Sequence, residues 1–128
     1  MFKITPIQDK SEQIEICKLC SAQYRENCFG YKMFDMETGE IMGISQFEIS
    51  KHGYIYDLRP RNNLEDYEAM FILGRQTMNF IDTCGAHTCY ASMDAGNPKL
   101  LSAIGFKEVE GQLFADMTGM FDGNCKNH

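Results

Sequence analysis

Apolar and polar residues alternate over much of the chain, which is the pattern of half-buried β-strands. The alternation predicts strands at residues 2–7, 28–36, 41–50, 54–59, 88–93, 106–109 and 113–118. Gly39 and Gly53 lie in the short turns after the second and third of these strands, so we expect an antiparallel meander there. Pro6 cannot donate a hydrogen bond to a neighbouring strand, which favours an edge position for the first strand.

Three other segments have the spacing of helices, with apolar residues recurring every three or four positions. The longest runs from Leu64 to Cys84. A first helix is predicted from about residue 11 to about residue 25, and a short one over residues 98–103. Because the long helix connects strands 54–59 and 88–93, these two strands are expected to be parallel.

The order of elements predicts a single α/β (α+β) domain over residues 1–128. Its features are a mixed central sheet with an antiparallel N-terminal meander, a long central helix, and a C-terminal strand, short helix and hairpin. A chain of 128 residues can bury a core without disulfide bonds. Residues 122–128 are predicted to be a frayed tail.

The composition limits the expected partners and location. A formal net charge of −6 argues against nucleic acid or an anionic membrane as a partner. Residues 1–10 lack the apolar core of a secretory signal, and no apolar run is long enough to span a membrane, so a cytoplasmic location is expected. The cysteines should then be reduced. Cys17 and Cys20 have the spacing of a metal or redox pair, but with only Cys28 nearby in sequence we favour buried thiols and expect no metal site.

A strand, a polar turn and a helix follow one another over residues 54–84. The start of a helix offers free N–H groups and a positive dipole end, where proteins commonly hold phosphate groups. Arg59 and Arg61 favour such a site. The loop has no glycine to let a phosphate approach its backbone, and acidic residues in the first turn could take the anion's role themselves: Glu65, Asp66 and Glu68. An anion site and a well-capped structural helix therefore both remain open.

Two segments carry a resemblance to a known family. Residues 54–84 are similar to the central strand, pyrophosphate loop and following helix of the GNAT superfamily of N-acetyltransferases. The stretch from Asn97 to Lys107, with its short helix and Gly105-Phe106, resembles the family's asparagine, short helix and Gly-Phe. The resemblance covers almost the whole chain and implies transfer of an acetyl group from acetyl-coenzyme A to an amine, on a small molecule or a peptide.

The resemblance also implies roles for particular residues. Backbone groups near Leu58 would contact pantetheine, the loop 59–64 would bind the pyrophosphate, and Asn97 would face the cofactor arm. The residues expected at the cofactor are thus Leu58, Arg59, Arg61, Asn62, Asn63 and Asn97. The loop keeps only the first position of the family's glycine-containing pattern. Leu101 stands where a tyrosine often protonates the leaving thiolate, and leucine cannot donate a proton.

Attack by an amine needs a base that removes its proton. Glu48 and Asp57 lie on adjacent predicted strands, and either could act as this base if burial raised its pKa. Acidic residues that simply face solvent on a strand have the same spacing, so a role without chemistry remains open for both residues. Several tyrosines could replace the missing acid or simply pack with the hydroxyl at the rim: Tyr31, Tyr54, Tyr56 and Tyr90.

Two functions follow from these residues. The first is an acyl-coenzyme A-dependent N-acyltransferase with a divergent pyrophosphate loop. The second is a non-catalytic GNAT-like module that binds a small ligand or a protein partner, which includes a second copy of itself. The geometry around Leu58 and Ala91 separates them, because the cofactor arm needs an open cleft between two splayed strands.

Overall fold

The computed structural model describes residues 1–121 and contains a 7-stranded sheet and three helices. The strands are β1 (Phe2–Pro6), β2 (Phe29–Asp35), β3 (Ile41–Ile49), β4 (Gly53–Pro60), β5 (Thr88–Ala91), β6 (Lys107–Val109) and β7 (Gln112–Asp116). The helices are α1 (Lys10–Leu19), α2 (Tyr67–Thr83) and α3 (Pro98–Ile104). The predicted tail, residues 122–128, lies outside the described residues.

The sheet has the strand order β1-β2-β3-β4-β5-β7-β6. Neighbouring strands are antiparallel except β4 and β5, which are parallel and joined by the crossover through α2. The predicted fold class, the meander β2-β3-β4, the edge position of β1 and the final hairpin are therefore confirmed. These features were predictable because alternation of side chains and turn glycines are local signals.

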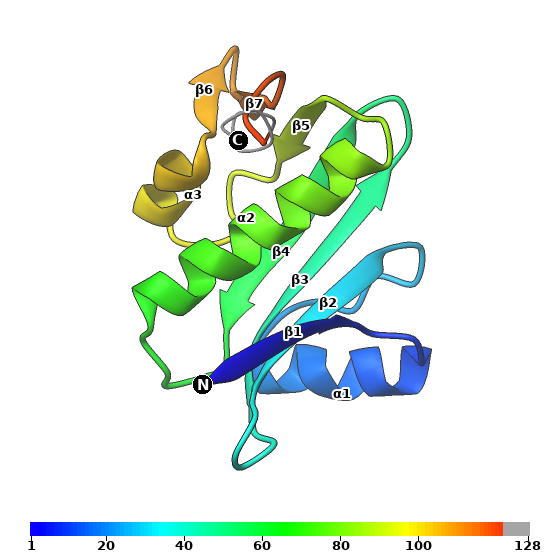
Figure 1. The fold of residues 1–128 in the computed structure, drawn as a ribbon, viewed down its shortest axis with the longest axis vertical. Coiled ribbons are helices and arrows are strands. Elements are labelled where there is room, and N and C mark those ends of the chain that lie inside the picture. Colours follow the sequence, from blue (N-terminus) through cyan, green and yellow to red (C-terminus); the bar gives the residue numbers. More distant parts are fainter. Residues whose placement is uncertain (122–128) are drawn as a thin grey trace, which may run out of the picture.

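Helices cover both faces of the sheet (Figure 1). Helix α2 runs diagonally across one face, in contact with β3, β4, β5 and α3. Helix α1 packs on β3 from the opposite face. No helix within residues 1–121 is long and apolar enough to cross a membrane.

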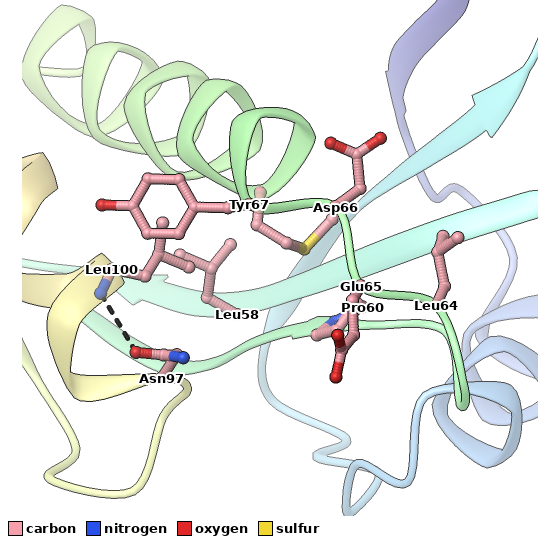
Figure 2. A pocket seen from close by; sticks show the side chains of 9 residues that line it. Leu58, Pro60, Leu64, Glu65, Asp66, Tyr67, Asn97 and Leu100 are labelled. Atoms are coloured by element: carbon pink, nitrogen blue, oxygen red, sulfur yellow. Dashed lines mark hydrogen bonds between the residues drawn. The ribbon is translucent and has the colours of Figure 1, made fainter.

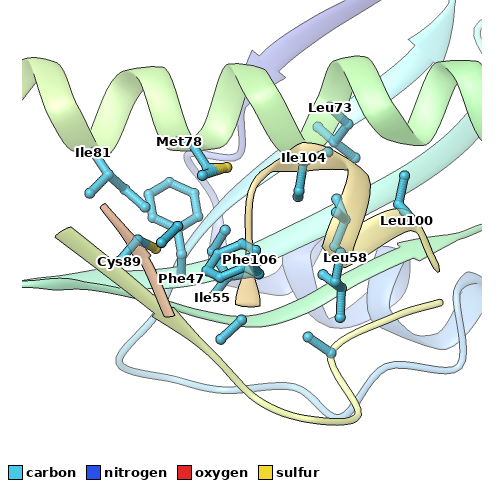
Figure 3. Close-up of a cluster of buried hydrophobic side chains, with 14 of the residues drawn as sticks. Phe47, Ile55, Leu58, Leu73, Met78, Ile81, Cys89, Leu100, Ile104 and Phe106 are labelled. Atoms are coloured by element: carbon cyan, nitrogen blue, oxygen red, sulfur yellow. The ribbon is translucent and has the colours of Figure 1, made fainter. Parts of the chain in front are cut away.

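The larger core lies between the sheet and the pair α2 and α3. Figure 3 shows Leu73, Met78 and Ile81 of α2 pointing from the helix into a cluster that includes Leu58 and Ile55 of β4, with Ile81 beside Cys89. The three helical residues recur at intervals that place them on one face of α2, as the sequence pattern predicts. Leu101 is fully buried in the same core, so the side chain at this position is part of the packing. A smaller cluster beneath α1 consists of Ile16, Cys17, Cys20 and Ile44.

Two predicted helix boundaries are wrong. Helix α1 ends at Leu19 rather than near residue 25, because Ser21 adopts a left-handed φ of 53° and the Ala22 N–H turns back to the Cys17 carbonyl. Helix α2 starts at Tyr67 rather than Leu64, because the Asp66 side chain accepts a hydrogen bond from Ala69 N and acts as the N-cap.

Candidate functional site

Strands β4 and β5 pair over a short stretch and then separate. The paired residues are Gly53 to Ile55 on β4 and Cys89 to Ala91 on β5. Farther along β4, Tyr56 is an extra residue in the ladder with β3, because Asp57 lies opposite Gln46 while Ile55 lies opposite Phe47. Such a bulge changes the side of the sheet to which the following side chains point. It brings Asp57 to the face that carries Gln46.

The gap between the separated strands is filled by the chain itself. The Ser92 N–H donates to the Ile55 carbonyl at 3.0 Å, and the Leu58 N–H donates to the Ala95 carbonyl at 2.8 Å. Ala95 is 0% exposed. Gly96 lies so close to β4 that a Cβ there would overlap the Leu58 carbonyl oxygen. Residues 92–96 therefore occupy the space beside β4, and the Leu58 backbone donor is already in use.

A cleft of about 320 Å³ lies between the end of β4, the start of α2 and α3 (Figure 2). Its lining is mainly apolar and includes Leu58, Met70 and Leu100. Tyr67, which is 52% exposed, extends along its rim toward α3 in Figure 2. The charged residues of the lining are both acids, Glu65 and Asp66. This cleft, which we call the α2–α3 cleft, thus suits an apolar or cationic group better than a phosphate.

A second hollow of about 440 Å³ adjoins this cleft along the loop that follows β4, and the two share Leu58, Pro60, Leu64, Glu65 and Asn97. Its lining brings together all six residues that the resemblance assigns to the cofactor: Leu58, Arg59, Arg61, Asn62, Asn63 and Asn97. The Arg59 side chain donates to the Asp94 carbonyl at 2.6 Å, and Arg61 lies 3.7 Å from Glu40. We call this hollow the arginine hollow.

The backbone donors of the loop are mostly used within the protein. Arg61 N donates to the Met42 carbonyl and Asn62 N to the Leu19 carbonyl, both at 2.8 Å. Leu64 N donates to the Arg61 carbonyl at 3.0 Å. The start of α2 is likewise supplied with negative charge, by the Asp66 cap and by Glu68 in the first turn. The N–H groups of Asn63, Glu65 and Asp66 have no partner among the described residues, but a pyrophosphate here would also meet two carboxylates.

Asp57 lies at the centre of a polar network on the α1 face of the sheet. The carboxylate is 1% exposed and accepts hydrogen bonds from Arg25 Nε at 2.9 Å, Gln46 Nε2 at 2.8 Å and Arg59 Nε at 3.0 Å. Gln46 Oε1 in turn accepts from Gln13 at 2.8 Å. Burial lowers the pKa of the Arg25 guanidinium, but the hydrogen bond and charge of Asp57 outweigh this and raise that pKa above its ordinary value. Both carboxylate oxygens of Asp57 are therefore engaged.

Glu48 lies apart from this network. It is half-exposed on β3, opposite Tyr54, and lines a shallow hollow of about 440 Å³ with Asn27 and Phe29. Within residues 1–121 its carboxylate makes no hydrogen bond or ion pair. Burial raises the pKa of the nearby Tyr56 hydroxyl, and the negative charge of Glu48 raises it further.

The buried cysteines behave as core residues. Burial raises the pKa of Cys17 to about 11 and that of Cys20 to about 12, so both thiols are protonated at neutral pH. Among residues 1–121 no group of three or more His, Cys, Asp and Glu side chains could hold a metal ion.

The chain is similar in fold to several solved structures. The sequence matches no protein-family model and no curated protein. Among solved structures, a Bacillus subtilis acetyltransferase in complex with CoA has a TM-score of 0.70 at 13% identity, covering 91% of this chain and 99% of that one. A bacterial toxin has a TM-score of 0.72 at 11% identity, covering 100% and 97% of the two chains. The KacTA–DNA complex has a TM-score of 0.69 at 12% identity, covering 100% of both.

The chain has the GNAT fold. At these identities the likeness is one of fold, and the sequence is a divergent version of it. The expected absence of nucleic acid and of a membrane partner, the homodimer and the cytoplasmic location remain predictions.

Acetyl-coenzyme A is the group that the GNAT fold implies, and the residues present do not fit it. The pantetheine arm would need the gap between β4 and β5, which Ala95 and Gly96 fill. Two amides of the pyrophosphate loop, those of Arg61 and Asn62, already donate to Met42 and Leu19. Both obstacles lie within the part of the chain that the structure describes.

Some members of the site have little or no signal in the sequence. Arg25 is predicted at the end of the first helix, whereas it lies in the loop after α1 and reaches Asp57. Gln46 gave only a weak signal, because β3 also carries Ser45 and Glu48, and a polar residue on an alternating strand is usually exposed. Ala95 gave none, because Asp94-Ala95-Gly96 has the composition of an ordinary exposed turn.

Proposed function

We propose that this protein is a non-catalytic GNAT-fold module that binds a small ligand in the α2–α3 cleft. The observation that carries the proposal is the hydrogen bond from the Leu58 N–H to the Ala95 carbonyl, which closes the path of a cofactor arm along β4. The engaged carboxylate of Asp57 agrees with it, since a base must be free to accept a proton. So does the leucine at position 101, which has no proton to donate.

The lining of the α2–α3 cleft defines the class of ligand. Leu58, Met70 and Leu100 favour an apolar body, and Glu65 favours a cationic or hydrogen-bond-donating group at the rim. We therefore expect a small apolar amine rather than a phosphorylated molecule.

The second candidate is acetyl transfer from acetyl-coenzyme A to an amine. The arginine hollow favours it, because Arg59 and Arg61 could meet a pyrophosphate there, beside Asn62, Asn63 and Asn97. Glu48, whose carboxylate has no partner among the described residues, would then be a better candidate for the base than Asp57. This function requires residues 92–96 to leave β4.

Calorimetric titration with acetyl-coenzyme A separates the two candidates. We expect no binding heat and no thermal stabilisation up to about 1 mM ligand, a concentration that would reveal binding of about −4 kcal/mol. A parallel titration with alkyl amines, followed by NMR, should shift the signals of Leu100 and Tyr67, and alkyl carboxylates of equal length should not.

Variants make each outcome decisive. Micromolar binding of acetyl-coenzyme A that weakens in an Arg59→Ala, Arg61→Ala protein would overturn the first proposal in favour of the second. The matched control is Lys3→Ala, Lys51→Ala, which removes the same charge from exposed positions elsewhere. Absence of binding by both acetyl-coenzyme A and amines would overturn both candidates for these hollows.

A further inference from the structure

A row of aromatic rings crosses the half of the sheet that α1 does not cover. Tyr54 on β4 lies beside Tyr90 on β5, and Tyr90 lies beside Phe114 on β7, at matching register positions. The ring centroids are 6.5 Å apart in the first pair and 5.2 Å in the second. Tyr56, the bulged residue of β4, lies 4.4 Å from Tyr54. We call these four residues the aromatic row.

The aromatic row faces away from the main core. Its neighbours along the strands, Ile55, Cys89 and Ala115, point into the core beneath α2, so the alternation of side chains directs the rings to the opposite face. Helix α1 packs on β3, and no helix within residues 1–121 packs on this face over β5, β6 or β7. All four rings are half-exposed. A hollow of about 260 Å³ is lined by Tyr90 and Phe114 at the far end of the row.

The charges around the row are negative beside Tyr54 and of both signs near Phe114, where Lys107 of β6 lies directly opposite. Glu48 lies directly opposite Tyr54 on β3, and Glu110 lines the hollow beside Tyr90. A carboxylate next to an electron-rich ring face attracts a cation and repels a phosphate. Stacking of nucleobases, which such a platform could otherwise support, is therefore disfavoured beside Glu48 and by the formal net charge of −6.

The protein already holds one guanidinium on this row. Arg25 Cζ lies 4.8 Å from the centroid of the Tyr56 ring while the same side chain pairs with Asp57. An arginine side chain lying over a tyrosine and paired with a carboxylate is thus accommodated on this surface. Tyr54 repeats part of the arrangement one step along the row, with Glu48 opposite it and no arginine or lysine of residues 1–121 over its ring. The neighbouring Tyr90 has the His52 ring packed against it, with centroids 5.4 Å apart and the planes at 85°.

We propose that the aromatic row binds an arginine side chain of a protein partner, with the guanidinium between Tyr54 and Tyr90 and paired with Glu48. These rings are inclined by 24° and their centroids are 6.5 Å apart. That is close to twice the roughly 3.5 Å contact distance of stacked carbon atoms, so a slight rotation of either ring admits one flat group. A guanidinium is flat, weakly hydrated and able to stack, whereas the ammonium of lysine is compact and strongly hydrated. The proposal does not depend on what the α2–α3 cleft binds.

A blocked peptide, Gly-Arg-Gly-Arg-Gly, tests this proposal against its citrulline counterpart, which has nearly the same shape and no charge. The protein has no Trp, so its intrinsic fluorescence reports on tyrosines. NMR signals of the Tyr54 and Tyr90 rings locate the binding. We expect the arginine peptide to bind at least about fivefold more tightly than the citrulline peptide, and less tightly as salt is added.

Variants identify the groups responsible. A Tyr54→Leu, Tyr90→Leu protein should bind about tenfold more weakly, since each ring contributes roughly two- to fivefold. Tyr54→Phe should keep most of the affinity because it keeps the ring, and Glu48→Gln should lose much of the salt dependence. Tyr67→Leu is the matched control, an exposed tyrosine on α2.

Three results would overturn the proposal. They are equal binding of the citrulline peptide, equal loss in the Tyr67→Leu control, and ring signals that do not move in a protein whose circular dichroism shows it to be folded. Tighter binding of a single-stranded DNA oligonucleotide on the same rings would also overturn it, in favour of nucleic acid.

Discussion

The face of the sheet beneath α2 buries a continuous apolar core, whereas the face beneath α1 buries a small apolar cluster beside a polar network. The first face includes Leu73, Met78 and Ile104, all 0% exposed, and its buried polar pair is Ser45 and Thr77, 2.8 Å apart. The second combines the cluster of Ile16 and Ile44 with the network around Asp57. Burial of apolar area is non-directional, while hydrogen bonds have strict geometry.

The two faces therefore have different roles: one supplies the stability of the fold, and the other fixes the geometry of the site. The α2 face supplies most of the apolar burial and hence most of the free energy of folding. The α1 face fixes where Arg25, Asp57 and Arg59 lie at the point where β4 and β5 separate. A GNAT fold can therefore be retained by the first face while the second changes its chemistry.

The largest expected effect is that of Leu73→Ala on the α2 face. Removal of a fully buried leucine leaves a cavity, and we expect the free energy of unfolding to fall by about 3–4 kcal/mol. Ile16→Ala on the α1 face should cost less, about 2 kcal/mol, because the smaller cluster at the edge of the fold can collapse around the gap. Urea denaturation with an unchanged m-value measures both. Equal losses would mean that the two faces contribute alike.

The next effect concerns the network. Asp57→Ala leaves the guanidinium groups of Arg25 and Arg59 without their counterion, and we expect a loss of about 2 kcal/mol. The loss is smaller than for a fully buried pair because both arginine side chains are 30% exposed and reach water. Asp57→Asn keeps one acceptor and should cost about half as much. If the two substitutions cost the same, charge rather than hydrogen bonding holds the network together.

The same contrast explains which features were predictable from sequence. Strand order and the parallel pair β4 and β5 follow from local alternation, turn glycines and one crossover helix. The end of α1 and the start of α2 depend on single residues, Ser21 and Asp66, which compete with equally plausible residues nearby. Helix boundaries were therefore less certain than strand order.

The candidate site was predictable only in part. Arg59, Arg61, Asn62 and Asn63 are adjacent in sequence, so their grouping around one hollow follows from the loop that carries them. The hydrogen bond between Leu58 and Ala95 joins positions far apart in the chain, as does the ion pair of Arg25 and Asp57. Contacts of this kind leave no local pattern, and they are the ones that close the gap beside β4.

The smallest expected effect is a difference in how readily the two faces of the sheet open to solvent. Burial raises the pKa of Cys17 to about 11, of Cys20 to about 12 and of Cys89 to about 12. The thiolate is the reactive form, so at pH 8 these thiols should react with iodoacetamide only when the structure opens. Cys17 and Cys20 lie in the small cluster under α1, and Cys89 lies in the main core. We therefore expect the first two to react about fivefold faster, which corresponds to an opening free energy about 1 kcal/mol lower.

Mass spectrometry of a Cys125→Ser protein measures these rates, with the exposed Cys84 as the reference for an accessible thiol. The raised pKa values also fix the sign of the pH dependence. Between about pH 9 and 11 the unfolded chain releases thiol protons that the folded chain retains, so the unfolded state binds fewer protons and the free energy of unfolding falls as the pH rises. Labelling of Cys17, Cys20 and Cys89 should accelerate in this range through opening. Faster labelling of Cys89 than of Cys17 would show that the main core opens first, and the assignment of stability to the α2 face would then be wrong.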